Sequence, residues 1–255
     1  MMEPMKKHSK SNMAKSYFTG TQDREFNLES MRKYLKQKPE MDKVLETMIA
    51  PYMKPGSEVL DACCGIGHLT HSLHKKFPRA HYLGIDETPY LIKEARKLSA
   101  PESTVRFEID DLYLLRNTYK KAFDISICWK TLTWLPSYEY ALRALVAVTK
   151  KHIFVSSLFY EGNIDSEIRV REYSKERGSR GNATYHNIYS LPRFERFVRT
   201  LGSKKISVID FKIGIDLPRG PVDHMGTYTL RLKNGKRLQM SGPLPMPWKI
   251  IHIEL

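Results

Sequence analysis

Apolar residues recur at two different spacings along the chain. Between residues 26 and 53 they return every three or four positions, as they do on one face of a helix. Lys38-Pro39 interrupts this pattern, so it predicts two consecutive helices near the N-terminus. The apolar positions are Phe26, Leu28, Met31, Tyr34, Leu35, Met41, Val44, Leu45, Met48 and Ile49.

From residue 58 onwards, short apolar runs alternate with helical patterns. The run from Phe123 to Cys128 is apolar almost throughout, which is typical of a parallel strand covered on both faces. Alternation of this kind predicts an α/β fold with a doubly wound, mostly parallel sheet. The predicted strands are 58–61, 81–85, 104–109, 123–128 and 152–157, and the predicted helices are 67–77, 89–98 and 138–148.

After Ser157 the pattern changes. Residues 159–189 are polar, rich in Tyr, Arg and Asn, and without a clean period. A helix over 191–201 and a strand over 205–215 follow, and then two strands, 226–232 and 237–240, flank Asn234-Gly235, which predicts a two-residue hairpin turn. With a last strand over 248–253, the parallel core is expected to carry antiparallel strands at its C-terminal end.

Length and composition are those of one globular domain. The chain has 255 residues, of which 41% are hydrophobic and 27% are charged, and no apolar run reaches the roughly 20 residues that cross a bilayer. Residues 1–20 are predicted to form a flexible basic tail without a secretory signal. Three cysteines without metal-ligand spacing predict reduced thiols, no metal site and a cytoplasmic protein.

The formal net charge of +14 indicates an affinity for anions. Lysine and arginine are spread along the whole chain, and no RNA-binding motif is present. We therefore expect a small, anionic acceptor molecule and regard nucleic acid as a weaker alternative. The oligomeric state is not predicted.

A nucleoside-binding pattern begins at the end of the first strand. Glycines directly after a strand allow the backbone to approach a ligand, and the next helix offers its free N–H groups. Asp86, at the end of the following strand, is placed to accept both hydroxyls of a ribose. A dinucleotide fingerprint would have its third glycine where this sequence has Thr70, so an NAD-dependent oxidoreductase is disfavoured.

Four segments resemble, in order and spacing, the motifs of class I S-adenosylmethionine-dependent methyltransferases. The first departs from the family pattern at Cys63, which stands where the family has a glycine. The resemblance implies that Asp86 holds the ribose, that Asp111 accepts from the adenine amino group and that Leu112 faces the ring. The matching residues are Asp61, Ala62, Cys63, Gly65 and Gly67; Asp86; Asp110, Asp111 and Leu112; and residues 123–129 ending in Trp129.

The resemblance also implies an architecture. It predicts a seven-stranded mostly parallel sheet with N-terminal helices and a C-terminal antiparallel hairpin extension, forming one methyltransferase domain over residues 21–255. Residues 56–158 would form the cofactor half, 159–189 an insertion or lid, and 190–255 the C-terminal strands and substrate loops. Segments 129–136, 156–160 and 241–248 resemble methyltransferases associated with envelope and capsular polysaccharide synthesis.

The acceptor is expected at the carboxyl edge of the sheet, within reach of 129–136, 160–165, 184–189 and 216–225. His186 and His224 are the predicted bases, with Tyr160 and Asp223 as hydrogen-bonding groups. Arginines at 169, 171, 177 and 180 are either a solvated surface or a phosphate clamp.

The predicted function is methyl transfer from S-adenosylmethionine to an O or N atom of a small molecule, such as a nucleotide-linked sugar or another envelope precursor. Two alternatives remain open: an RNA methyltransferase, and a non-catalytic protein that binds S-adenosylmethionine.

Overall fold

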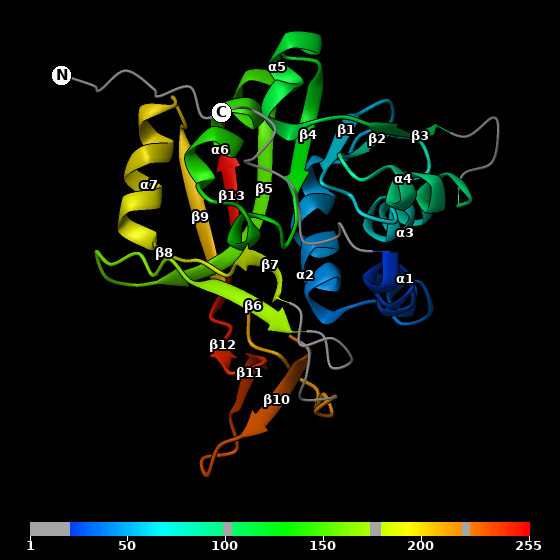
Figure 1. Cartoon of the computed structure of the whole chain (residues 1–255). Helices are drawn as coiled ribbons and strands as arrows, with labels where there is room; N and C mark the ends of the chain where they lie inside the picture. The colour runs from blue at the N-terminus through cyan, green and yellow to red at the C-terminus, as the bar shows by residue number, and fades with distance from the viewer. Residues whose placement is uncertain (1–20, 99–103, 174–179, 221–224) are drawn as a thin grey trace.

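A computed structural model describes residues 21–98, 104–173, 180–220 and 225–255, so the predicted tail at 1–20 lies outside it. The large sheet has the strand order β3-β2-β1-β4-β5-β13-β9, and a short eighth strand, β8, pairs with β5 (Figure 1). Its strands are β1 Glu58–Ala62, β2 His81–Asp86, β3 Val105–Ile109, β4 Phe123–Cys128, β5 Thr149–Tyr160, β8 Ile188–Ser190, β9 Lys205–Asp210 and β13 Trp248–Glu254.

Strands β1 to β5 and β8 pair in parallel, whereas β13 pairs antiparallel with both β5 and β9. The doubly wound, mostly parallel sheet predicted from the sequence is therefore confirmed, with seven strands on its main path and β8 in addition. All carboxyl ends of the parallel strands meet at one edge, where ligands of such sheets bind.

Helices cover the two faces of the sheet with separate cores. On one face, Leu45, Leu73 and Ile92 pack against β-strand residues such as Ile125. On the other, Leu142 and Phe194 belong to a second buried cluster. The helices are α1 Thr21–Lys36, α2 Glu40–Ile49, α3 His68–Lys76, α4 Pro89–Arg96, α5 Leu115–Thr118, α6 Tyr138–Val148 and α7 Leu191–Thr200, with short 3-10 turns η1 Ala50–Tyr52, η2 Leu112–Leu114 and η3 Leu132–Trp134.

Two helices, α6 and α7, begin with a serine that satisfies a free backbone N–H group. The Ser137 hydroxyl accepts from the Glu139 N–H at 3.2 Å at the start of α6, and the Ser190 hydroxyl accepts from the Arg193 N–H at 3.3 Å at the start of α7. Pro89 opens α4, where its missing N–H costs nothing. None of the described helices is long and apolar enough to span a membrane.

The segment over 159–189 is more regular than its composition predicts. Strands β6, Arg169–Tyr173, and β7, Arg180–Tyr185, form an antiparallel ribbon, and β8 then joins the large sheet. The ribbon stands outside the two helix-covered cores, so its strands lack the apolar alternation that marks a half-buried strand. The prediction of an irregular segment was wrong for this reason.

A three-stranded sheet of β10 Thr227–Arg231, β11 Arg237–Ser241 and β12 Leu244–Pro245 forms the C-terminal extension. The last hydrogen bond of its hairpin runs from the Leu232 N–H to the Lys236 carbonyl. This bond leaves Lys233, Asn234 and Gly235 as the loop. Only Gly235 has a positive φ, 77°, so the turn is a three-residue loop rather than the predicted two-residue one, in which both residues would be left-handed. Strand β9 ends at Asp210, earlier than the predicted residue 215.

Candidate cofactor site and acceptor side

The loop between β1 and α3 contains three residues with left-handed backbone. They are Cys63 with φ 61°, Gly65 with φ 58° and Gly67 with φ 74°. A Cβ on Gly67 would lie 2.5 Å from Cζ of Phe107, so no larger residue fits there. Cys63 adopts the same conformation at the energetic cost of a non-glycine residue.

Asp86 connects this loop to the end of β2. One carboxylate oxygen accepts the Gly65 N–H at 3.0 Å, and the other accepts the Thr88 N–H at 2.9 Å. Burial raises the pKa of Asp86, while these hydrogen bonds counteract the rise. Each carboxylate oxygen can accept more than one hydrogen bond, so the side chain retains capacity for ribose hydroxyls.

Asp61 lies beneath the loop and is 2% exposed. Its carboxylate accepts the Thr70 hydroxyl at 2.6 Å. Burial, together with the nearby negative charges of Asp42 and Asp86, raises the pKa of Asp61 to about 7, although the hydrogen bond from Thr70 opposes the rise. Thr70, which breaks the dinucleotide fingerprint, is thus the hydrogen-bond partner of the first acid of the motif.

The residues after β3 form a short turn. The Asp110 carboxylate accepts the Asp111 N–H at 2.8 Å, and the Asp111 carboxylate caps η2 by accepting the Tyr113 N–H at 2.8 Å. Leu112 is buried beside them. The structure places all three predicted residues at the carboxyl edge, next to the end of β2.

The residues after β4 meet a partner that the sequence did not indicate. The Trp129 indole N–H donates to Asp42 Oδ1 at 2.8 Å, and Lys130 Nζ lies 3.1 Å from the same oxygen. His68 Nε2, at the start of α3, is 3.3 Å from Oδ2 of Asp42. We call Asp42, His68, Trp129 and Lys130 the Asp42 cluster. It joins α2 to both the glycine loop and the end of β4.

The Asp42 cluster is buried and charged. Burial would raise the pKa of Asp42, but Lys130, His68 and Trp129 lower it to about 2. Lys130 has a φ of 58°, an uncommon conformation for a lysine, and its ammonium lies 5.5 Å from the ring centre of Tyr34 on α1. Asp42 Oδ2 and His68 Nε2 are buried without a well-formed hydrogen bond. The two atoms lie 3.3 Å apart, so each compensates part of the cost of burying the other.

One signal in the sequence could have revealed Asp42. It shares the buried face of α2 with Met41, Leu45 and Ile49, and an acidic residue on an apolar helix face needs a partner. Trp129 is 7% exposed and directs its indole N–H to Asp42, and its contact with the cofactor stays a prediction.

On the acceptor side, His186 is fully buried between β7 and β8. Both of its ring nitrogens lack a hydrogen-bond partner, and its ring meets Trp134 edge-on at 4.9 Å between centroids. Burial lowers its pKa to about 4, so the imidazole is neutral near pH 7. A neutral imidazole offers one donor and one acceptor to a ligand.

Hydrogen bonds attach this segment to the loop after β4. Asn187 and Thr133 exchange two of them: the Asn187 N–H donates to the Thr133 carbonyl at 2.8 Å, and the Thr133 hydroxyl donates to the Asn187 carbonyl at 2.9 Å. The Tyr189 hydroxyl is 2.9 Å from the carbonyls of both Leu132 and Leu135. The segment containing His186 is therefore fixed beside the end of β4.

The structure describes some of the other predicted acceptor residues and not the rest. Tyr160, at the end of β5, is 50% exposed, and its ring covers Gly162. His224, Asp223 and Arg177 lie outside the described residues. The Arg169 guanidinium stacks over the Tyr185 ring at 5.2 Å, which favours neither a phosphate clamp nor a solvated surface by itself.

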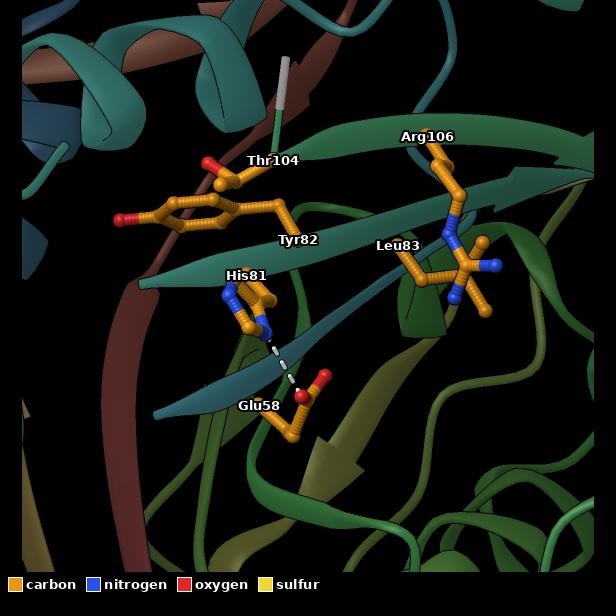
Figure 2. Close-up of a pocket in the computed structure, with 6 residues that line it drawn as sticks. All are labelled: Glu58, His81, Tyr82, Leu83, Thr104 and Arg106. Carbon is orange, nitrogen blue, oxygen red and sulfur yellow. Dashed lines mark hydrogen bonds and ion pairs between the residues drawn. The ribbon is translucent and has the colours of Figure 1, made fainter. Parts of the chain in front are cut away.

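A pocket of about 200 Å³ lies elsewhere (Figure 2). It is lined by residues at the amino ends of β1, β2 and β3, where Glu58 and His81 point toward each other at 2.8 Å. The glycine loop follows the opposite, carboxyl ends of these strands. This pocket is therefore distinct from the cofactor site.

Residues 53–198, more than half of the chain, match the family described as methyltransferase domain, and the chain belongs to this family. Its fold is that of the class I enzymes that use S-adenosylmethionine. One similar structure is magnesium protoporphyrin IX methyltransferase from Synechocystis PCC 6803 with bound S-adenosylmethionine, with a TM-score of 0.52, 16% identity and coverage of 84% of this chain and 78% of that one. Another is 1,6-didemethyltoxoflavin-N1-methyltransferase from Burkholderia thailandensis, with a TM-score of 0.53, 13% identity and coverage of 91% and 85%.

Curated relatives match a shorter stretch. Trans-aconitate 2-methyltransferase from Enterobacter sp. (strain 638) is 30% identical over 124 residues, which are 48% of this chain and 47% of that protein. The corresponding protein from Escherichia coli O7:K1 is 35% identical over 95 residues, 37% of this chain and 35% of its own. The chain thus spans about half the length, or less, of the curated relatives it matches.

Proposed function

We propose that the protein transfers a methyl group from S-adenosylmethionine to an O or N atom of a small molecule. The observation that carries this proposal is a group of three neighbouring carboxylates, Asp42, Asp61 and Asp86, beside the glycine loop at the carboxyl edge of the sheet. A cofactor with a positive sulfonium and an α-ammonium group suits such an acidic setting, whereas a dinucleotide pyrophosphate would be repelled.

Each part of the cofactor has a candidate partner. Asp86 would accept from the ribose hydroxyls, Asp111 from the adenine amino group, and Leu112 would face the adenine ring. When bound, the cofactor supplies an activated methyl group on sulfur.

The methionine end would lie at the Asp42 cluster. Asp42 Oδ2 and Asp61 are suited to the α-ammonium group, and Lys130 to the carboxylate. The residues' main contribution to rate is to hold the two reactants in line, an effect worth about 7–11 kcal/mol at most.

The acceptor would occupy the space between the β4 loop and the β6–β8 segment. His186 is neutral and weakly basic there, so it would orient an acceptor by hydrogen bonding more readily than it would remove a strongly held proton. Tyr160 and His224 remain proposed acceptor residues. The relatives named for trans-aconitate and the basic charge support an anionic acceptor, for which a nucleotide-linked sugar or another envelope precursor is a proposal.

The proposal is tested by binding and by transfer of label. Calorimetry should detect S-adenosylmethionine, S-adenosylhomocysteine and 5′-methylthioadenosine. Asp42→Asn should weaken the first two about tenfold or more and leave the third unchanged, because methylthioadenosine lacks the amino-acid part. Tight NAD binding without any response to these nucleosides would contradict the proposal.

The transfer experiment uses methyl-labelled S-adenosylmethionine and fractionated cell extract. We expect label in a small-molecule fraction. Label confined to RNA would favour the RNA methyltransferase alternative, which the net charge of +14 supports. Cofactor binding without transfer to any fraction would favour a non-catalytic binding protein.

A further inference from the structure

The hairpin of β10 and β11 presents leucine side chains to solvent. Leu230, Leu232 and Leu238 are 43%, 44% and 36% exposed. Leu230 pairs directly with Leu238, and Leu232 follows Leu230 by two positions, so all three lie on one face of the hairpin. We call these three residues the leucine face. A group of exposed leucines on one surface indicates an interaction site, whereas scattered exposed leucines are normal.

Positive charge surrounds the leucine face. Lys233 and Lys236 are exposed on either side of the turn, and no acidic partner is recorded for them among the described residues. Arg231 and Arg237 both pair with Asp216, on the opposite face of the strands. The tip of the hairpin therefore combines apolar side chains with two unneutralised ammonium groups.

The hairpin is attached at the same edge of the large sheet as the glycine loop. Asp210 ends β9 opposite Lys249, and Trp248 begins β13 opposite Leu158 near the carboxyl end of β5. The segment between them, which contains the hairpin, leaves and re-enters the sheet at this edge and projects away from the sheet below β6 (Figure 1).

We propose that the hairpin docks on an anionic lipid bilayer, with the leucine face entering the interface and Lys233 and Lys236 contacting the headgroups. Interfacial elements bind through buried apolar side chains together with attraction between basic residues and anionic lipid. Docking brings the cofactor edge of the sheet to the membrane surface. Docking of this surface does not depend on which acceptor the protein methylates.

The charge and the leucines of the hairpin favour a bilayer over two other partners, a second copy of the chain and nucleic acid. A second copy of the chain also carries a net charge of +14, so apposing two hairpin tips would bring like charges together. Nucleic acid would use the lysines but gains little from exposed leucines. An anionic bilayer is complementary to both the leucine face and the two lysines.

The test is sedimentation of the full chain with vesicles of phosphatidylcholine, or of an equal mixture of phosphatidylcholine and phosphatidylglycerol. We expect strong binding only to the mixed vesicles. The variant K233Q/K236Q should lower the partition coefficient about 25-fold, about fivefold for each lysine. The variant L230S/L232S/L238S should lower it about tenfold or more.

A matched control removes an exposed aromatic residue and an exposed lysine elsewhere. Tyr140 on α6 is 44% exposed, and Lys150 lies near the amino end of β5, at the opposite edge of the sheet. The variant Y140S/K150Q should bind vesicles as the parent does. Calorimetry of S-adenosylmethionine with every variant separates loss of docking from loss of fold or of the proposed activity.

Four results would overturn the docking proposal. One is equal sedimentation of the parent and both hairpin variants, and a second is no binding to the mixed vesicles. Another is a dimer in analytical ultracentrifugation that the leucine variant abolishes. The last is tight RNA binding that requires the lysines, is indifferent to the leucines and competes with vesicles.

Discussion

The cofactor half, residues 56–158, and the acceptor side, residues 159–247, are stabilised differently. In the first, parallel strands are buried between helices, and the functional loops are fixed by buried hydrogen bonds such as that from Thr70 to Asp61. In the second, small antiparallel sheets have many exposed side chains, and His186 is buried without hydrogen bonds to its ring. We therefore propose that the candidate cofactor site is preorganised and that a ligand completes the proposed acceptor side.

The largest expected difference between the two regions is their tolerance of a Cβ at a left-handed glycine. Gly67→Ala should lower the free energy of unfolding by about 2–5 kcal/mol, because it combines backbone strain with a clash against Phe107. Gly235→Ala, in the hairpin, has the same strain but open space and should cost about 1–2 kcal/mol. Urea denaturation measures both. Equal losses would show that the glycine loop is no more tightly packed than the hairpin.

A change in pH should also affect the stability contributed by the two regions in opposite directions. The pKa of His186 falls from 6.5 to about 4 on folding, so its stabilising contribution is present above pH 6.5 and is lost as the pH falls toward 4. The pKa of Asp61 rises from 3.8 to about 7, so its contribution is present below pH 3.8 and is lost as the pH rises toward 7. The effect is at most about 3 kcal/mol for His186 and about 4 kcal/mol for Asp61.

Variants isolate these two contributions. The stability of His186→Gln relative to the parent should improve as the pH falls from 6.5 to 4, and that of Asp61→Asn should improve as the pH rises from 4 to 7. Chemical denaturation at several pH values measures both trends. A parallel pH dependence of a variant and the parent would mean that the replaced group does not titrate as stated.

Next in size is the loss of one charge at the ribose position. Asp86→Asn should weaken S-adenosylmethionine about 10–150-fold, because charge-assisted hydrogen bonds contribute roughly 1.5–3 kcal/mol. On the acceptor side, Tyr160→Phe should leave cofactor affinity unchanged. Calorimetry compares the two, with circular dichroism as the check on folding. An unchanged dissociation constant for Asp86→Asn would remove it from the site.

The smallest effect is expected where the glycine loop departs from its family. Cys63→Gly removes the strain of a φ of 61° but also the packing of the Cys63 side chain against the core. These opposing contributions are each about 1 kcal/mol, so the midpoint of thermal unfolding and cofactor affinity should change little. A loss above about 2 kcal/mol would assign Cys63 a structural role that glycine cannot replace.

The difference between the two regions also explains which features could be predicted from the sequence and which could not. Strands such as Phe123–Cys128 and the loop from Asp61 to Gly67 were predictable, because burial on both faces and left-handed glycines leave local patterns. The Asp42 cluster was not, because it depends on a contact between α2 and β4 that no local spacing encodes. The β6–β7 ribbon was missed because exposed strands need no apolar alternation.

The position of β13 affects how the chain is made. This strand lies between β5 and β9, and it is synthesised after both of them. Until residues 248–254 leave the ribosome, the edges of β5 and β9 have unpaired backbone groups. Phe154 and Val155 also lack the β13 residues that pair with them. Open, apolar strand edges invite pairing with other chains. We therefore expect nascent chains released before β13 is complete to aggregate and to depend on chaperones.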